Sequence, residues 1–198
     1  MKTKEQKLAQ VDELVLKLGL TRDEVIDFFS KLPPVKEPKK SRPKIDITQV
    51  KVGMIWYEDD TFSFDRITGK KIKAIVELVE GGIIYGDLTA SELFEIEEQY
   101  LTWHRAMRYI ENFSYPCQKN EKIVLYSLKQ FVKLSATYEH VRRTFDKIHK
   151  QCRECWYWSS TERSSTHAWD LDFSGGSKYN ASKTNASYVR PVLALKVE

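Results

Sequence analysis

Three cysteines and one histidine are the residues whose types and spacing could bind a metal ion. His149, Cys152 and Cys155 form an HxxCxxC pattern, and Cys117 could supply a fourth ligand for tetrahedral zinc. Structural zinc sites usually show two spaced cysteine pairs, whereas this chain has a single CxxC. The pair also does not open a helix after a strand, as redox-active pairs do. We therefore expect two semi-buried thiols, no metal ion and no cofactor.

Two carboxylates near the C-terminus could act as an acid/base pair or as metal ligands. Asp170 and Asp172 alternate with the apolar residues of 169–173, and this period of two places both carboxylates on one face of a strand. No further cluster of oxygen ligands is nearby in the sequence, so we interpret them as solvent-facing contacts for a partner. No Ser or Cys is placed by spacing to be activated by His167, and we expect no catalytic residue.

Small polar residues are interleaved with large apolar ones in the last forty or so residues. The apolar ones recur at strand spacing, and we expect Trp158, Trp169 and Phe173 in the core. An aromatic scaffold that carries many short polar side chains is typical of a binding surface, with Tyr179 as its natural anchor. The candidate ligand-binding residues are Ser165, His167, Asp170, Asp172, Ser174, Ser177, Tyr179, Asn180, Ser182, Asn185 and Ser187.

The elements that must position these residues follow from hydrophobic periodicity. Strand patterns occur at 54–57, 62–65, 74–79, 82–88, 156–161, 168–173 and 188–196. Helical patterns with one apolar side cover 91–113 and 127–150. Gly81-Gly82 and Gly175-Gly176 are predicted hairpin turns. This order predicts an α+β domain and excludes a parallel-sheet nucleotide-binding fold.

Residues 1–44 differ from the rest of the chain in charge. They hold 11 Lys and Arg against 7 Asp and Glu, whereas 45–198 hold 21 of each. Residues 1–32 are predicted to form two short amphipathic helices, which should self-associate or dock on a partner because they cannot bury both apolar stripes alone. Residues 33–44 form a Pro- and Lys-rich linker, for which we favour a solvated role over nucleic-acid binding. Residues 45–198 then form the ligand-binding domain.

The sequence of 198 residues shows no secretory signal and no apolar run long enough to span a membrane. An odd number of cysteines in such a chain argues for reduced thiols. We therefore expect a protein of the cytoplasm or of a virion.

The C-terminal motifs resemble those of a known family. They are YWSSTE at 157–162, AW at 168–169, Phe173, Gly176, Lys183 and VRPV at 189–192. This pattern is similar to the C-terminal signature of bacterial and phage domains with a C-type lectin-like fold. That group includes many variable proteins of diversity-generating retroelements and is related in fold to the formylglycine-generating enzyme. VGMIWYEDDTFSF, TWHRAMRYI and YSLKQFVKL resemble the family's opening hairpin and two helices, so the resemblance covers about residues 50–196.

The resemblance implies a function as well as a fold. In retroelement variable proteins the motif residues are structural, and the positions between them are diversified by adenine-directed mutagenesis. Every candidate ligand-binding position carries a residue type that such diversification yields, whereas Lys178 does not. The chain lacks the Glu-Pro-Asn, Gln-Pro-Asp and Trp-Asn-Asp triplets of calcium-dependent, sugar-binding lectins. We therefore expect a non-enzymatic display protein that binds a protein or cell-surface ligand through its C-terminal residues.

Two alternatives come from other functional classes. An enzyme related to the formylglycine-generating fold would use Cys152 and Cys155, and metal content together with thiol reactivity would reveal it. A nucleic-acid-binding module would use the basic linker and would bind with strong salt dependence.

Overall fold

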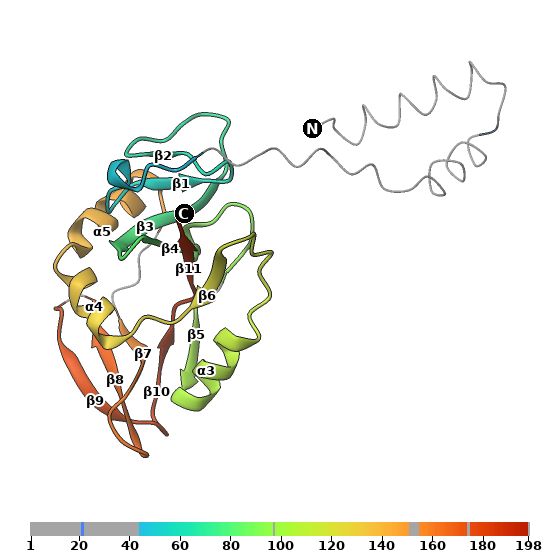
Figure 1. The fold of residues 1–198 in the computed structure, drawn as a ribbon. Coiled ribbons are helices and arrows are strands. Elements are labelled where there is room, and N and C mark those ends of the chain that lie inside the picture. The colour runs from blue at the N-terminus through green and yellow to red at the C-terminus, as the bar shows by residue number, and fades with distance from the viewer. Residues whose placement is uncertain (1–20, 22–43, 97, 151–154, 174, 198) are drawn as a thin grey trace. The chain divides into compact units, whose positions relative to one another are not determined.

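The computed structural model describes residues 21, 44–96, 98–150, 155–173 and 175–197. The chain divides into two compact units, Met1–Ser41 and Arg42–Glu198. The predicted appendage and linker lie outside the described residues apart from Thr21 and Lys44, so self-association or docking through residues 1–32 stays a prediction. The second unit combines helices with two sheets, which confirms the predicted α+β class (Figure 1).

Six antiparallel strands form the first sheet, in the order β2-β1-β3-β4-β11-β6. Their bounds are Phe62–Ser63 (β2), Ile55–Tyr57 (β1), Ile72–Glu80 (β3), Ile83–Asp87 (β4), Val192–Lys196 (β11) and Glu121–Val124 (β6). The predicted turn between β3 and β4 is confirmed, because Gly81 and Gly82 have φ of +58° and +77°, a region that favours glycine. The sequence pattern did not indicate β6.

Five strands form the second sheet, in the order β5-β10-β7-β8-β9. Their bounds are Gln99–Thr102 (β5), Ala186–Val189 (β10), Trp156–Glu162 (β7), His167–Asp172 (β8) and Lys178–Ser182 (β9). β10 pairs with β7 in parallel, and the other neighbours pair antiparallel. The predicted strand 188–196 is wrong in one respect, since it is two strands separated at Arg190-Pro191. Proline cannot donate to a strand ladder, and the chain passes there from the second sheet to the first.

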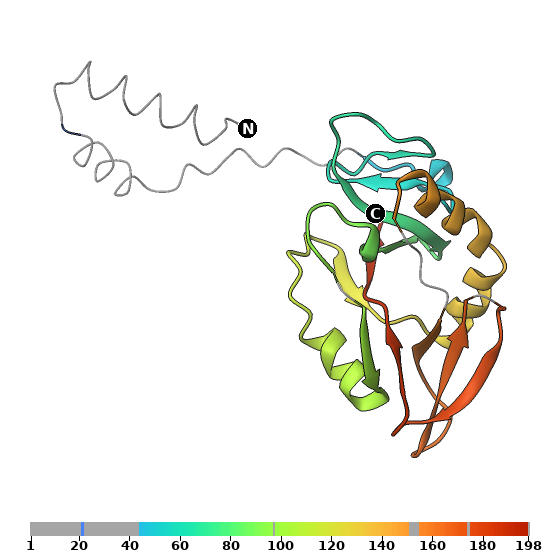
Figure 2. The ribbon, with the colours of Figure 1, turned by 180° about the vertical axis from the view of Figure 1, so that it is seen from behind.

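Helices α3 (Trp103–Glu111), α4 (Leu128–Ser135) and α5 (Tyr138–Lys147) flank the sheets. α3 lies on one side, and α4 with α5 lies on the other (Figures 1 and 2). The predicted helix 91–113 is wrong over 91–96 and 98–102, where no residue is helical. Residues 99–102 instead pair with β10 as β5, and this tertiary pairing outweighs local propensity. Short 3₁₀ turns, Ile47–Gln49 and Leu88–Ala90, complete the fold.

The predicted helix 127–150 is two helices with a break between Ser135 and Tyr138. Ser127 begins the first one with a capping box, in which the Ser127 N–H donates to Oε1 of Gln130 at 2.9 Å. The break lets both helices direct apolar side chains into one core cluster, to which α4 contributes Phe131 and α5 contributes Phe145.

Aromatic side chains of the C-terminal motifs occupy the core, with one exception. Trp158 and Phe173 are buried, as predicted. The expectation for Trp169 is wrong, since this side chain is only half-buried. It lies opposite Asn180 of β9, which is an edge strand of the second sheet and offers little cover.

A buried ionic cluster lies where the chain passes between the sheets. Nη1 of Arg190 lies 3.2 Å from Oε1 of Glu77 and 3.1 Å from Oδ2 of Asp87, and its Nε lies 3.2 Å from Oε1 of Glu98. The guanidinium lies 4.4 Å from the ring centroid of Tyr157. Burial, followed by repulsion from Asp87, raises the pKa of Glu77 to about 8. Arg190 is therefore the cation that makes these buried carboxyl groups tolerable.

A second buried cation lies in the first sheet. Nζ of Lys73 is 3.0 Å from Oδ1 of Asp60 and 2.6 Å from Oε1 of Glu121. The same nitrogen lies 4.7 Å from the ring centroid of Trp56, whose Nε1–H donates to Asp60 at 2.8 Å. In both clusters a basic side chain satisfies carboxylates while it lies over an aromatic ring.

Candidate ligand-binding site

Exposed aromatic side chains gather on the second sheet. The exposed large apolar side chains of the described residues are Phe64, Phe94, Tyr100, Val132, Trp156 and Tyr179. Three of them, Tyr100, Trp156 and Tyr179, line one pocket of about 520 Å³. The other lining residues are Cys155, Asp170, Asp172, Ala181, Asn185, Ala186, Ser187 and Tyr188. We call this site the aromatic pocket, and its volume falls within the range of ligand sites.

Every strand of the second sheet contributes to the aromatic pocket. Tyr100 of β5 lies opposite Tyr188 of β10, with ring centroids 5.1 Å apart. Trp156 of β7 and Tyr179 of β9 lie edge to face, with centroids 6.3 Å apart. Two aromatic pairs therefore line the aromatic pocket. Asp170 of β8 is the lining residue whose charged side chain is buried.

The side chain of Asp170 is more buried than the sequence pattern predicted. The residue is 4% exposed, and its Oδ2 accepts a hydrogen bond from Oγ of Ser187 at 3.0 Å. Its Oδ1 is buried and has no hydrogen-bond partner among the described residues. Burial raises the pKa of Asp170 to about 6, against the weaker opposing effect of the Ser187 hydrogen bond.

The expectation that Asp170 and Ser187 face solvent is therefore wrong. Ser187 is 4% exposed and reaches Asp170 from β10, across the intervening strand β7. Asp170 also lies opposite the buried Trp158 of β7. The period of two places Asp170 on the same side of β8 as Asp172, as predicted, but Asp170 is buried there beside Trp158 of β7 and Ser187 of β10.

The other predicted residues of the aromatic pocket are more accessible. Asp172 is half-buried and lies opposite Trp156. Tyr179 is 60% exposed and lies opposite Asp170, and Asn185 is exposed in the turn before β10. The aromatic pocket thus brings together five of the predicted ligand-binding residues.

Five further predicted residues lie outside the aromatic pocket. Asn180 pairs with Trp169, and Ser182 pairs with His167, so strand alternation places these positions on the opposite side of β8 and β9 from Asp170. Ser177 is exposed before β9. The predicted set therefore does not form one continuous surface.

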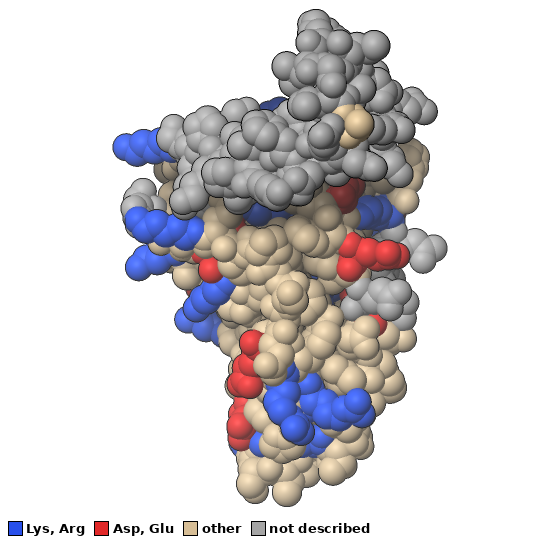
Figure 3. Space-filling model, turned by 90° about the vertical axis from the view of Figure 1, so that its right-hand side faces the viewer, with Lys and Arg blue, Asp and Glu red and all other residues tan. Residues whose placement is uncertain are grey.

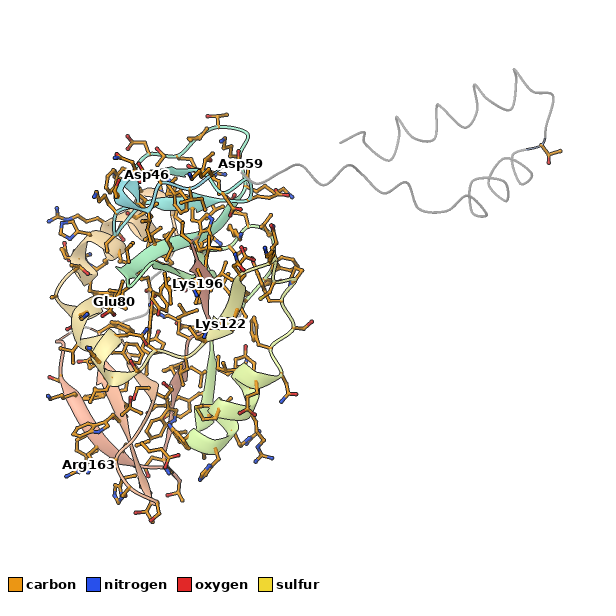
Figure 4. All side chains as sticks on the ribbon, viewed as in Figure 1. Asp46, Asp59, Glu80, Lys122, Arg163 and Lys196 are labelled. Carbon is orange, nitrogen blue, oxygen red and sulfur yellow. The ribbon has the colours of Figure 1, made fainter. Side chains whose placement is uncertain are left out.

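Ser165 occupies the turn between β7 and β8 together with Arg163, which lies at the opposite end of the second unit from Asp59 (Figure 4). Its carbonyl oxygen accepts a hydrogen bond from Nζ of Lys183 at 3.2 Å, so at least its backbone has a structural role. Nδ1 of His167 lies 2.9 Å from Oγ1 of Thr166. Ser174 lies outside the described residues.

Sequence reasoning missed the two tyrosines that form one aromatic pair of the pocket. Tyr100 fell within the predicted helix 91–113 and Tyr188 within the predicted strand 188–196, and neither was among the candidate ligand-binding residues. A usable signal was the isolated β-forming run around Tyr100, QYLT at 99–102. Its exposed aromatic position is meaningful only once β5 is known to pair with β10.

The cysteines do not converge on a metal site within the part of the chain that the structure describes. Cys117 is exposed, and Cys155 is half-buried and lines the aromatic pocket. Among the described residues, no group of three or more His, Cys, Asp or Glu is placed to hold a metal ion. Cys152 lies outside these residues, so the zinc and redox interpretations of the HxxCxxC pattern stay untested.

Charged side chains of both signs occur on the face that carries α3 (Figure 3). Basic side chains gather toward the lower end of this view, and acidic side chains lie beside them. In residues 44–96, 98–150, 155–173 and 175–197, no helix has both the length and the apolar character needed to cross a membrane.

No protein-family model matches the chain, and no curated protein matches it either. The chemistry of the aromatic pocket therefore rests on its own residues. They supply aromatic rings, two carboxyl groups, the thiol of Cys155 and small polar side chains. Aromatic rings and short polar side chains are the residue types that a binding surface uses.

Proposed function

We propose that this protein is a ligand-binding protein that displays a variable contact surface on its second sheet, with a C-type lectin-like fold. The observation that carries this proposal is the aromatic pocket. Residues predicted from their small polar character and from a family resemblance, namely Asp172, Tyr179 and Asn185, gather there beside exposed rings.

The distribution of burial along the C-terminal motifs supports a fixed scaffold with variable positions between them. The motif residues Tyr157, Trp158, Ala168, Val189 and Arg190 are all buried, with exposed fractions of 1% or less. The exposed positions between the motifs can change without loss of core contacts, since surface substitutions usually alter stability by within about 0.5 kcal/mol.

The aromatic pocket favours a protein or cell-surface ligand. Tyrosine and tryptophan supply large rigid contact areas at low conformational cost, and Asn and Ser supply adaptable hydrogen bonds, as in antibody paratopes. Tyr100, Trp156 and Tyr179 fill the first role, and Asn185 fills the second. We extend the proposal to the class of protein, a variable protein of a diversity-generating retroelement, on the strength of the motif resemblance.

Two cell-surface display libraries test the binding surface. The first randomises Asp172, Ser177, Tyr179 and Asn185, and the second randomises four exposed positions in or beside the first sheet, Glu58, Lys71, Lys122 and Lys196. Both are selected against the same panel of unrelated proteins, with the amount of displayed protein as the measure of folding. We expect binders from the first library and few from the second.

Equal recovery from the two libraries would contradict a dedicated surface on the second sheet. Loss of displayed protein only in the first library would show that these positions are structural. The assignment to a retroelement has a separate test in the neighbouring DNA. It requires a reverse transcriptase gene and a near-repeat of the 3′ coding end that differs at adenines.

A further inference from the structure

Carboxyl groups and aromatic rings meet in the aromatic pocket without a basic side chain among the lining residues. Asp170 and Asp172 come from β8, and the four rings that line the same pocket come from the other strands of the sheet, β5, β7, β9 and β10. No Lys, Arg or His is among the eleven residues that line the site, all of which the structure describes. An anionic or strongly acidic ligand would meet repulsion there, whereas a cation would meet attraction from both the carboxylates and the ring faces.

The same chain shows what this combination of groups binds. Lys73 lies 4.7 Å from the ring centroid of Trp56 beside Asp60 and Glu121. Arg190 and Lys183 repeat the arrangement. Arg190 lies 4.4 Å from the ring of Tyr157 beside Glu77, and Lys183 lies 4.5 Å from the ring of Trp103 and 2.8 Å from Oε2 of Glu162. Three times, a basic side chain fills the space between a carboxylate and an aromatic ring.

The surroundings of Asp170 are a second, independent observation that points to a cationic ligand. It is 4% exposed, forms no ion pair among the described residues, and leaves Oδ1 without a hydrogen-bond partner. Burial of a carboxylate destabilises the folded protein unless a cation or hydrogen-bond donors pair with it. Oδ2 of Asp87 in the first sheet also lacks a hydrogen-bond partner, but it lies 3.1 Å from Nη1 of Arg190, and Glu121 has Lys73 as its cation.

We propose that the aromatic pocket binds a basic side chain, Lys or Arg, of a partner protein, between its aromatic rings and the carboxylates of Asp170 and Asp172. The inference rests on the proposed ligand-binding function and names the chemistry of the contact. Tyr179 and Tyr100 contribute accessible ring surface, since they are 60% and 62% exposed. The volume of about 520 Å³ admits a whole Lys or Arg side chain with part of its backbone.

Binding of the cation should depend on pH, because the pKa of free Asp170 is about 6. The cation stabilises the ionised carboxylate, so its affinity should fall as the pH falls below about 6. The other titratable groups that line the site are Asp172, Cys155 and the tyrosines at 100, 179 and 188. The variant Asp170→Asn isolates the contribution of Asp170 from theirs.

The test uses three capped tripeptides, acetyl-Gly-Xaa-Gly-amide, in which Xaa is lysine, its uncharged counterpart norleucine, or glutamate. Each is titrated to millimolar concentrations against the ¹⁵N-labelled full chain, and amide shifts report the affinity. We expect the lysine peptide to bind about tenfold more tightly than the norleucine peptide, with the glutamate peptide weakest. An arginine peptide should behave like the lysine peptide.

The variants Asp170→Asn and Asp172→Asn should each remove most of the preference for lysine over norleucine. Glu58→Gln is the matched control, since it removes one exposed carboxylate beside the first sheet and should leave the preference unchanged. The dispersion of the amide spectrum shows whether each variant is folded. If Asp170→Asn does not fold, Asp172→Asn and the pH dependence of the parent protein carry the test.

Equal affinity for the lysine and norleucine peptides would overturn the inference, and so would the lack of a measurable shift with any peptide. A preference that survives both Asp variants would place the cation elsewhere. These outcomes are distinct from failure of the proposed function. Binders from the first display library without a preference for lysine would leave a ligand-binding surface in place and remove only the cationic contact.

Discussion

The two sheets of this domain differ in how many of their side chains are buried. Every residue of β1 and four of the five residues of β11 are buried, and apolar clusters cover both sides of the first sheet. In β9, by contrast, Ala181 alone of five residues is buried. The first sheet is therefore the scaffold, and the second sheet combines a covered side with an accessible one.

The contrast extends to the buried carboxyl groups. Asp87 and Glu121 in the first sheet each lie within 3.1 Å of a nitrogen of a basic side chain. Asp170 in the second sheet forms no ion pair among the described residues, and its Oδ2 accepts a hydrogen bond from the hydroxyl of Ser187. Compensated charge is what a stable core requires, whereas uncompensated charge beside exposed rings is what a binding site can use.

The largest effect should follow from removal of the cation at the junction. Arg190→Met should reduce the free energy of unfolding by roughly 3–5 kcal/mol, because it removes the cation beside the buried Asp87 and the partly buried Glu98. Urea unfolding followed by circular dichroism measures this loss. Glu77→Gln is the control and should cost much less, since burial raises the pKa of Glu77 and favours its neutral form. If Arg190→Met lowers the free energy of unfolding by no more than the loss of a surface ion pair, about 1 kcal/mol, the contrast between the buried carboxyl groups of the two sheets is wrong.

Substitution of two tryptophans compares the stability contributed by the buried part and by the edge of the second sheet. Trp158→Ala should cost roughly 3–5 kcal/mol, because it opens a cavity in the core. Trp169→Ala should cost less than half as much, because its side chain is only half-buried at the β9 edge. Thermal unfolding of both variants under the same conditions gives the comparison. Equal losses would show that the β9 edge is as well packed as the core.

Asp170→Asn should raise stability at neutral pH and change its pH dependence. The folded-state pKa of Asp170 is about 6, above its ordinary value of 3.8. Because the folded-state pKa is raised, Asp170 contributes its full stabilisation of the folded state below pH 3.8, the ordinary pKa of the group. This contribution is lost as the pH rises through about 6. The stability of the parent protein relative to Asp170→Asn should therefore decline from about pH 4 to about pH 7.

Asp172→Asn is the companion measurement, since Asp172 is half-buried on the same strand. Denaturant unfolding at a series of pH values provides the data for both variants. If the difference in stability between the parent protein and Asp170→Asn stays constant over this range, Asp170 titrates with its ordinary pKa. The uncompensated buried carboxylate would then be ruled out.

The smallest effects on stability are expected at the accessible residues. Tyr179→Ala and Asn185→Ala should each change the free energy of unfolding by within about 0.5 kcal/mol, because their side chains are exposed. Tyr179→Ala should nevertheless weaken binding of the lysine peptide, since it removes one ring of the aromatic pocket. A loss of stability comparable to that of Trp158→Ala would identify Tyr179 as a structural residue.

Local patterns by themselves determined much of the scaffold. Alternation of apolar residues located β1 to β4, β7 and β8, and the glycine pair predicted the turn between β3 and β4. The same alternation placed Asp170 and Asp172 on one side of β8. These features depend on neighbours two residues apart or on the conformational freedom of glycine, so the sequence carries them directly.

Only the tertiary structure decided which residues form the candidate site. Residues 99–102 become β5 because they pair with Ala186–Val189, nearly ninety residues later, and this pairing brings Tyr100 to Tyr188. Asp170 is buried because Ser187 reaches it from a strand that is not its neighbour. Periodicity tells which side chains share a face of a strand. Which strands lie beside that face, and how deeply they cover it, depends on contacts between distant residues that no local pattern records.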